Sequence, residues 1–498
     1  MAAYAFICPY CGKKIDETNI LFVYDGYPTI YTDTVRFNFL TKCSSQWPFD
    51  NGDRFKGLYF HPVPENTRYR DEGEKKHVPV LTYARLSSGL TPRELADPDM
   101  LNATGEDKPE PNDDPIPISN RACPHCHCRL PNNYGLYDTM FVSMMGGRAA
   151  GKTAFLLSMI HQLSTQLPAR SLGNATLHAE SQVFYNMQND YYQANQGVTL
   201  PTPKDERLFP FVFEYTYFNN SVTKTCFIVI YDIAGEGMNQ PDYLLGHLGI
   251  KQAKTVLLML DPNMLNAGGY DAAIHSSMET DADQNAGTMD MYDSEAAAGS
   301  HDFYDSPLMA FLSQAVVSNR NLGVLEDVRN VIAVTTKMDQ PLMVEPERFG
   351  GNCILKEDLG NAHKNMLDLS VVNQVHRDVS AMYERYNIAL VDSVRAAFSG
   401  GQNDQVKVIA LAASTYTRVP GKGIQFINSY QEAAPKHRII EPFLILLHLA
   451  GMIPVGGLKP KAETTPAPEP TGTGKGNKGK DKNKVEKPKK RGLFGRKK

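Results

Sequence analysis

The sequence predicts an α/β protein whose central domain, residues 136–420, is built on a mainly parallel sheet. Strand-like and helix-like segments alternate through this domain, which is typical of parallel strands joined by helices. A glycine-rich loop also lies between an apolar strand expected over 139–145 and a helix expected over 154–167. The composition, with 42% hydrophobic and 21% charged residues, is that of an ordinary globular chain.

A chain of 498 residues is long enough for two or three domains. Two short cysteine-containing segments precede the central domain and enclose a β-rich insert, in which 20–24 and 35–39 are expected strands. The cysteine-containing segments are 1–16 and 119–134, and the insert between them is 17–118. The central domain, 136–420, contains an acidic insert at 263–305. It is followed by a helical segment, 425–456, with its helix expected over 437–453, and by a disordered basic tail, 457–498.

The glycine-rich loop has the pattern of a phosphate-binding loop, G-x-x-x-x-G-K-[ST]. Gly146 and Gly151 allow the chain to curl, so that backbone N–H groups converge on a polyphosphate. Lys152 can reach the β- and γ-phosphates, and the Thr153 hydroxyl can bind Mg²⁺. The nucleotide-binding residues expected in this loop are Gly146, Gly147, Arg148, Ala149, Ala150, Gly151, Lys152 and Thr153.

A candidate carboxylate ligand for Mg²⁺ follows the β-rich run 224–231. Asp232 ends this strand, where it is placed to bind Mg²⁺, usually through water. Gly235, three residues later, can donate its N–H to a γ-phosphate and permits a loop that shifts when that phosphate leaves. A partner strand is expected over 208–218, and of the two threonines before it, Thr199 and Thr202, we favour Thr202 as a Mg²⁺ ligand.

A base-reading element follows the apolar run 331–335. The sequence Thr336-Lys337-Met338-Asp339 fits [NT]-K-x-D, in which Asp339 can accept hydrogen bonds from the ring N–H and the amine of guanine. Adenine offers neither donor there, so the wrong base leaves a buried charge unpaired. The stem of Lys337 can lie over the base. Ala413 and Ser414, after a strand expected over 408–411, suit the loop behind the base.

The order of these motifs in residues 139–414 resembles that of a TRAFAC-class, Ras-like P-loop GTPase domain. In this chain, residues 257–261 correspond to the strand that such domains have between the switch segment and the base-reading element. The whole chain is similar to a narrower group, the bacterial double-GTPases, which join a zinc ribbon to a GTPase domain. This likeness lies in Cys-Pro-Tyr-Cys at 8–11, Cys-Pro-His-Cys at 123–126, and Glu441-Pro442-Phe443-Leu444 with Leu447. It implies binding of GTP and GDP with Mg²⁺, and a role in bacterial multi-gene systems, including defence, with protein partners encoded nearby.

The expected catalytic residues are Lys152, Glu236 and Arg148. Glu236 stands where many Ras-like proteins have a water-orienting Gln, and it either acts as a base or caps the switch helix. Arg148 is either an arginine finger supplied in cis or an outward, solvated side chain, and the second is favoured. Two alternatives to a GTPase stay open. One is a scaffold or adaptor that binds nucleotide without hydrolysing it and acts through the zinc ribbon and the tail, and the other is an ATPase.

Two C-x-x-C turns predict a structural zinc site with Cys8, Cys11, Cys123 and Cys126 as ligands. The turns are separated by 111 residues, which is why we interpret 17–118 as an insert between two halves of a zinc ribbon. A different ligand set that includes Cys43 or Cys128, and a set of unliganded thiols, stay open.

We expect a cytoplasmic protein. The chain starts without a secretory signal, and its strongest apolar run, 443–453, is too short for a transmembrane helix. Eight cysteines then indicate metal ligands or free thiols. Residues 457–498 hold fourteen Lys or Arg against four Asp or Glu, a net charge of +10. Such a tail either solubilises the protein or binds an anionic membrane surface, nucleic acid or an acidic partner.

Overall fold

The computed structural model describes residues 5–16, 20–24, 34–43, 58–60, 67–71, 77–81, 120–147, 150–194, 208–219, 222–233, 244–245, 248–262, 312–323, 325–338, 366–399, 406–414, 416–418, 424–426 and 438–456. All of these lie in the first of two units into which the chain divides, Met1–Gly457. The second unit, Leu458–Lys498, holds all but the first residue of the expected basic tail, and that tail lies outside the described residues.

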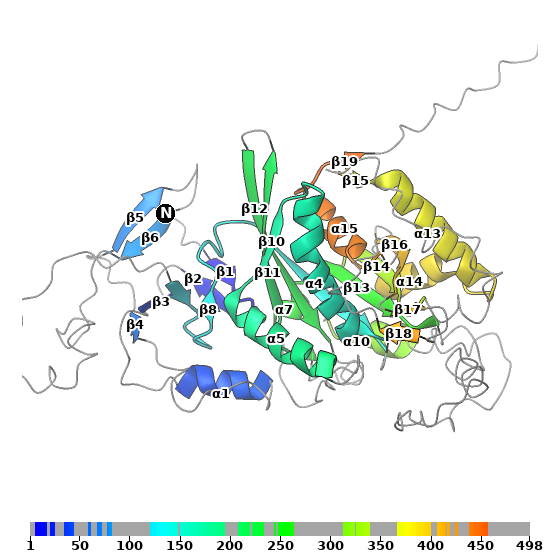
Figure 1. Cartoon of the computed structure of the whole chain (residues 1–498). Coiled ribbons are helices and arrows are strands. Elements are labelled where there is room, and N and C mark those ends of the chain that lie inside the picture. The colour runs from blue at the N-terminus through cyan, green and yellow to red at the C-terminus, as the bar shows by residue number, and fades with distance from the viewer. Residues whose placement is uncertain are drawn as a thin grey trace, which may run out of the picture. The chain divides into compact units, whose positions relative to one another are not determined.

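A seven-stranded sheet forms the centre of the first unit (Figure 1). Its strand order is β10-β11-β12-β9-β13-β14-β16. The four neighbouring pairs from β12 to β16 are parallel, whereas β11 pairs antiparallel with both β10 and β12. The strands are β9 (Thr139–Gly146), β10 (Asn174–Leu177), β11 (Phe211–Asn219), β12 (Val222–Asp232), β13 (Thr255–Leu260), β14 (Asn330–Thr335) and β16 (Lys407–Ala412). The predicted α/β fold with a mainly parallel sheet is confirmed.

The inner strands are continuous apolar runs because both of their faces are covered. All six residues of β13 are buried, as are five of the six in β14. The edge strand β10 has no buried residue. The parallel strands β9, β12, β13 and β14 end at the same edge of the sheet, so the loops that follow them converge there.

Helices cover this sheet. Helix α4 packs against β9 and β10, α5 packs against β11, and α13 and α14 pack against β16. The described helices are α4 (Lys152–Ala169), α5 (Ala179–Ala194), α7 (Leu248–Lys251), the π-helical η6 (Leu312–Val317), α10 (Ser318–Asn321), α13 (Leu369–Glu384), α14 (Leu390–Ser399), α1 (Thr34–Cys43) and α15 (Glu441–Leu449). Among the described residues, no helix is both long enough and apolar enough to cross a membrane.

The N-terminal region contains smaller sheets. β1 pairs with β2, β5 pairs with β6, and a four-stranded sheet has the order β4-β3-β7-β8. Because β3 pairs with β7 across the long insert, the second cysteine segment returns to the first. These strands are β1 (Ala5–Ile7), β2 (Lys14–Asp16), β3 (Leu21–Tyr24), β4 (Leu58–Phe60), β5 (Thr67–Asp71), β6 (His77–Leu81), β7 (Asn120–Ala122) and β8 (Arg129–Leu130).

One predicted strand of the insert is wrong, because residues 35–39 belong to helix α1. The alternation of Val35, Phe37 and Phe39 indicated a strand with one apolar face. In the helix, Val35 and Phe37 are 41% and 37% exposed, and the buried residues are Phe39, Leu40 and Cys43. Their spacing is helical, so packing favoured the helix over the local alternation.

The C-terminal helix α15 is shorter than the helix predicted over 437–453. Arg438 has a left-handed backbone (φ 51°) before the helix, and Gly451 has φ 68° after it, so both neighbours depart from helical geometry. Phe443 of α15 packs on Phe213 of β11, with ring centroids 5.2 Å apart. Three further short strands, β15 (Leu367–Asp368), β17 (Tyr416–Arg418) and β18 (Ile424–Phe426), precede the helix, and β19 (Val455–Gly456) follows it and pairs with β15.

Substitution of two glycines with similar backbone angles tests the packing around Gly173, which directly precedes the edge strand β10. Gly173 (φ 85°) and Gly451 (φ 68°) are both left-handed, but a Cβ on Gly173 would overlap the carbonyl oxygen of Thr216, whereas one on Gly451 would have open space. We expect Gly451→Ala to cost about 1–2 kcal/mol from backbone strain and Gly173→Ala about 2–4 kcal/mol, because it adds a steric clash. Thermal unfolding followed by circular dichroism measures both, and equal midpoints would contradict the described contact.

Candidate functional site

The phosphate-binding loop leaves the sheet from β9. A Cβ on Gly146, the last residue of β9, would lie 2.6 Å from the carbonyl oxygen of Met259, so the first glycine is required by the closeness of β13. Gly151 adopts φ 74° directly before α4, and its carbonyl accepts the N–H of Phe155 at 2.9 Å. Arg148 and Ala149 lie outside the described residues.

Lys152 lies under this loop as the first residue of α4. Its ammonium group donates to the carbonyl oxygens of Gly146 (3.0 Å) and Gly147 (2.8 Å). The side chain is therefore held beside the loop backbone and is largely buried. A cation in this position, at the N-terminus of a helix, suits an anionic ligand.

Thr153 and Asp232 meet across the sheet edge. The Thr153 hydroxyl donates to Oδ2 of Asp232 at 2.7 Å, while Oδ1 of Asp232 is buried and has no hydrogen-bond partner among the residues that the structure describes. Burial raises the pKa of Asp232, against the opposing effects of Lys152 and of the Thr153 hydrogen bond. A buried carboxylate oxygen without a donor beside a threonine hydroxyl fits Mg²⁺ or a water bound to it, since this cation prefers oxygen ligands.

The remaining switch residues lie outside the described residues: Thr202, Gly235 and Glu236. Their predicted roles stay predictions. The strands on either side of them are described, because β11 begins at Phe211 and β12 ends at Asp232.

The base-reading loop is attached to the phosphate-binding loop. The Thr336 hydroxyl donates to the carbonyl oxygens of Ala150 (2.8 Å) and Leu260 (3.1 Å), which links the ends of β14 and β13 to the phosphate-binding loop. Lys337 has a left-handed backbone (φ 51°). Asp339 itself lies outside the described residues.

The loop after β16 closes the same region. Ala413 donates its N–H to the carbonyl oxygen of Thr335 (2.8 Å) and accepts the N–H of Met338 (3.2 Å). Ala413 and Ser414 are both buried. Ala413, one of the two residues expected behind a base, therefore lies against the base-reading loop.

Two residues of this region were not among the predicted site residues. Asp261, directly after β13, forms an ion pair with Lys337 (Oδ2 to Nζ, 2.8 Å), and the hydroxyl of Tyr383 on α13 lies 3.0 Å from that of Thr335. The position of Asp261 carried a usable signal, because it is a carboxylate at the end of an apolar strand, as Asp232 is. Tyr383 lies inside an amphipathic helix and carried no such signal.

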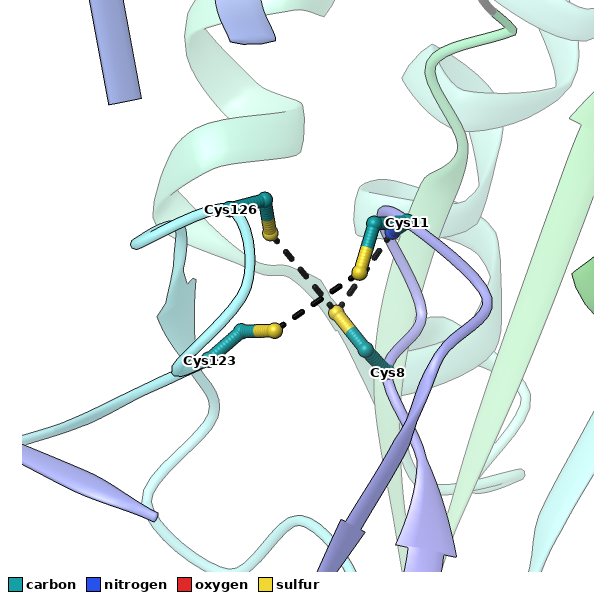
Figure 2. A group of neighbouring side chains, drawn as sticks. All are labelled: Cys8, Cys11, Cys123 and Cys126. Atoms are coloured by element: carbon teal, nitrogen blue, oxygen red, sulfur yellow. Dashed lines mark hydrogen bonds between the residues drawn. The ribbon is translucent and has the colours of Figure 1, made fainter. Parts of the chain in front are cut away.

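The four predicted zinc ligands form one cluster (Figure 2). The Sγ atoms of Cys8, Cys11, Cys123 and Cys126 all lie within 4.8 Å of one another. The Cys8–Cys126 and Cys11–Cys123 sulfur pairs are 3.9 Å and 3.6 Å apart. A tetrahedral ion with Zn–S bonds of about 2.3 Å requires sulfur pairs about 3.8 Å apart, so the cluster has the size of a zinc site.

The two turns of the cluster have the same backbone geometry. In each, the first cysteine accepts the N–H of the residue four positions later, which has a left-handed backbone: Gly12 (φ 69°) and His127 (φ 56°). Backbone N–H groups also point at sulfur, from Tyr10 to Cys8 and from His125 to Cys123, both at 3.4 Å. Donors of this kind stabilise thiolates, which are the form that binds metal.

Cys128 and Cys43 are not part of the cluster that can hold a metal, although both are buried. The backbone carbonyl of Cys128 closes its turn by accepting the N–H of Cys123 at 3.0 Å. Burial raises the pKa of Cys8 and Cys126, whereas hydrogen bonds from neighbouring thiols lower that of Cys11. A bound cation would stabilise the ionised forms of four thiols that lie this close together.

Comparisons with known proteins bear on the central domain. Residues 140–385 match the family model described as Double-GTPase 2. No curated protein matches the chain. Two solved structures of the Ski7 GTPase-like domain of S. cerevisiae match at 12% sequence identity and a TM-score of 0.24, one bound to GDP and inorganic phosphate and one bound to GTP.

The alignments cover 63% and 64% of this chain and 50% and 51% of those structures, so the chain spans about half of their length. At this TM-score they add nothing to the family match. The match covers the strand before the phosphate-binding loop, Asp232 and the base-reading element. Residues 140–385 are therefore a P-loop GTPase domain of the double-GTPase type.

Proposed function

We propose that this protein binds GTP with Mg²⁺ and hydrolyses it, and that two switch loops respond to the state of the nucleotide. The observation that carries the proposal is the contact between separate motifs. Thr153 of the phosphate-binding loop bonds Asp232, and Ala150 of the same loop bonds Thr336 of the base-reading element. Residues that we propose for phosphate, cation and base binding therefore lie at one edge of the sheet. The family match supports the same function.

Each residue has a distinct role in the proposal. The ammonium group of Lys152 neutralises charge on the β- and γ-phosphates, and Thr153 and Asp232 hold Mg²⁺, the latter through water. When bound there, Mg²⁺ would supply neutralisation of the phosphate charge. Asp339 reads guanine, Lys337 covers its ring, and Ala413 and Ser414 lie behind it.

The ion pair with Asp261 supports the proposed position of Lys337. It anchors the Lys337 ammonium group at the end of β13, 2.8 Å from the carboxylate. The alkyl stem between that anchor and the backbone of the base-reading loop is then restrained, which favours packing over a flat ring.

We also propose that Glu236 and Arg148 act on the hydrolysis step. Glu236 orients or deprotonates the attacking water, and Arg148 stabilises charge on the β/γ-phosphate oxygens. Thr202 and Gly235 complete the two switch loops around Mg²⁺ and the γ-phosphate.

Single-turnover hydrolysis tests the enzymatic proposal. We expect Lys152→Ala to lower the rate of GTP cleavage by at least about 100-fold, because a donor to the transferred phosphate is lost. Arg395→Ala is the matched control, since it removes an exposed cation that is paired with its helical neighbour Asp392. If the wild type binds GTP but cleaves it no faster than Lys152→Ala does, the protein is a nucleotide-binding scaffold rather than a hydrolase.

Competition against labelled GDP tests base recognition. We expect GTP to displace it at least about 100-fold better than ATP does, because adenine offers no donors to the proposed Asp339 carboxylate. Asp339→Ala should reduce this preference more than it weakens the binding of inorganic triphosphate. Equal displacement by ATP and GTP would show that the role given to Asp339 is wrong and that the protein is an ATPase.

We propose that the cysteine cluster binds one structural Zn²⁺. Four thiolates leave no open coordination position, so the ion would stabilise the fold and would not bind substrate. Metal analysis of the purified protein should give one zinc per chain. Cys126→Ser should lose the ion, whereas Cys128→Ser, which alters a buried thiol two residues away, should keep it. Zinc loss in Cys128→Ser with retention in Cys126→Ser would contradict the proposed ligand set.

The resemblance to double-GTPases also implies a setting, and we propose that the protein is a switch within a bacterial multi-gene conflict or defence system with protein partners encoded nearby. The family match supports the resemblance on which this setting rests. The net charge of +10 on residues 457–498 supports peripheral binding to an anionic surface, either a membrane or nucleic acid, by a protein that works in the cytoplasm.

A further inference from the structure

The first cysteine turn contacts the strand that carries Asp232. The hydroxyl of Tyr231 donates to the carbonyl oxygen of Pro9 at 2.6 Å. Pro9 lies between Cys8 and Cys11, and Tyr231 directly precedes Asp232 in β12. A single hydrogen bond therefore connects the cysteine cluster to the residue next to the proposed Mg²⁺ ligand.

Tyr231 is held firmly in place. Its side chain is buried, and a Cβ on Gly249 of α7 would overlap its hydroxyl, so α7 packs directly on the phenol. Burial raises the pKa of Tyr231 well above its usual value, which keeps the hydroxyl protonated as a donor. Since β12 precedes the D-x-x-G segment and α7 follows it, the contact between Tyr231 and α7 joins the two described elements that flank the second predicted switch.

The next residue of the same turn contacts the segment after the first switch. Tyr10 stacks on Phe209, with ring centroids 5.2 Å apart and an interplanar angle of 29°. Its hydroxyl lies 2.5 Å from Nδ1 of His178, whose backbone N–H donates to Val212 of β11 at 2.8 Å. Phe209 follows the predicted switch residue Thr202. The two residues between Cys8 and Cys11 thus contact the described segments beside both predicted switches.

We propose that the first cysteine turn positions the nucleotide site through Tyr231, so that zinc at the cysteine cluster and Mg²⁺·GTP at the phosphate-binding loop bind cooperatively. Successive side chains of a strand point to opposite faces, so Tyr231 fixes β12 from one face while Asp232 bonds Thr153 from the other. Zinc fixes Cys8 and Cys11 on either side of Pro9 and thereby fixes the acceptor of Tyr231. This inference rests on the proposed function.

Cooperative binding has a reciprocal consequence. If zinc strengthens the binding of Mg²⁺·GTP by some factor, Mg²⁺·GTP strengthens the binding of zinc by the same factor. Tyr231 is a positioning residue in this scheme, since it touches neither nucleotide nor metal. Its contribution is measured as the coupling between the two sites, not as the stability of the fold.

The test compares wild type with Tyr231→Phe and with Tyr215→Phe as a matched control. Tyr215 is a fully buried tyrosine of the neighbouring strand β11, and its hydroxyl donates to the carbonyl oxygen of Leu172, away from the cysteine turn. Both variants lose one buried tyrosine hydroxyl, so thermal unfolding should be affected similarly. Metal analysis first establishes that each full-length protein carries zinc.

Zinc release into a chromogenic chelator is then followed with and without saturating Mg²⁺ and a non-hydrolysable GTP analogue. Wild type and Tyr215→Phe should release zinc about 5- to 50-fold more slowly with the nucleotide, whereas Tyr231→Phe should show less than about a 2-fold difference. Removing zinc should also weaken the binding of the same analogue to wild type and Tyr215→Phe, with circular dichroism as a check on folding, and should change it little in Tyr231→Phe.

Two results would overturn the inference. One is zinc release from wild type that does not respond to nucleotide, and the other is a Tyr231→Phe variant with the coupling of wild type. If the wild type binds both zinc and GTP but binds them independently, the inference alone fails. If the wild type binds no GTP, the proposed function fails together with it.

Discussion

The pairing of β9 with β12 on one side and β13 on the other is the constraint on which the site depends. Its register sets Asp232 beside Met144 and Gly146 beside Met259. Buried backbone groups must be hydrogen bonded, so this register cannot slip without leaving several of them unpaired. It fixes the phosphate-binding loop between two strand ends. The Asp232 carboxylate is therefore within reach of the Thr153 hydroxyl, and the Met259 carbonyl leaves room only for glycine at 146.

The base-reading loop depends on the same strand ends. Thr336 contacts both Ala150 and Leu260, and Lys337 is paired with Asp261, so the loop after β14 is attached to those after β9 and β13. Each contact joins segments that are far apart in the chain. Parallel strands make this possible because their carboxyl ends all meet at one edge.

The cysteine cluster is assembled from two halves that are separated by 111 residues in the chain. Each half is a turn with its own backbone hydrogen bonds and a left-handed residue at the same position. Such turns can form locally, and the pairing of β3 with β7 brings them together. The position of the first turn against Tyr231 and Phe209 then attaches it to the GTPase domain next to both predicted switches.

The sequence by itself determined the features that are local in the chain. These are the glycine-rich loop between strand and helix, the apolar runs that became β9, β12, β13 and β14, and the two cysteine turns, because each depends on neighbouring residues and on backbone preferences. Local pattern failed at 35–39, where alternation predicted a strand and burial of Phe39, Leu40 and Cys43 favoured a helix.

Only the tertiary structure decided which distant groups meet. It placed Cys126 rather than Cys128 in the cluster, paired Asp261 with Lys337, and bonded Tyr231 to Pro9. These contacts depend on strand register and on the packing of one element against another, which no short stretch of sequence specifies.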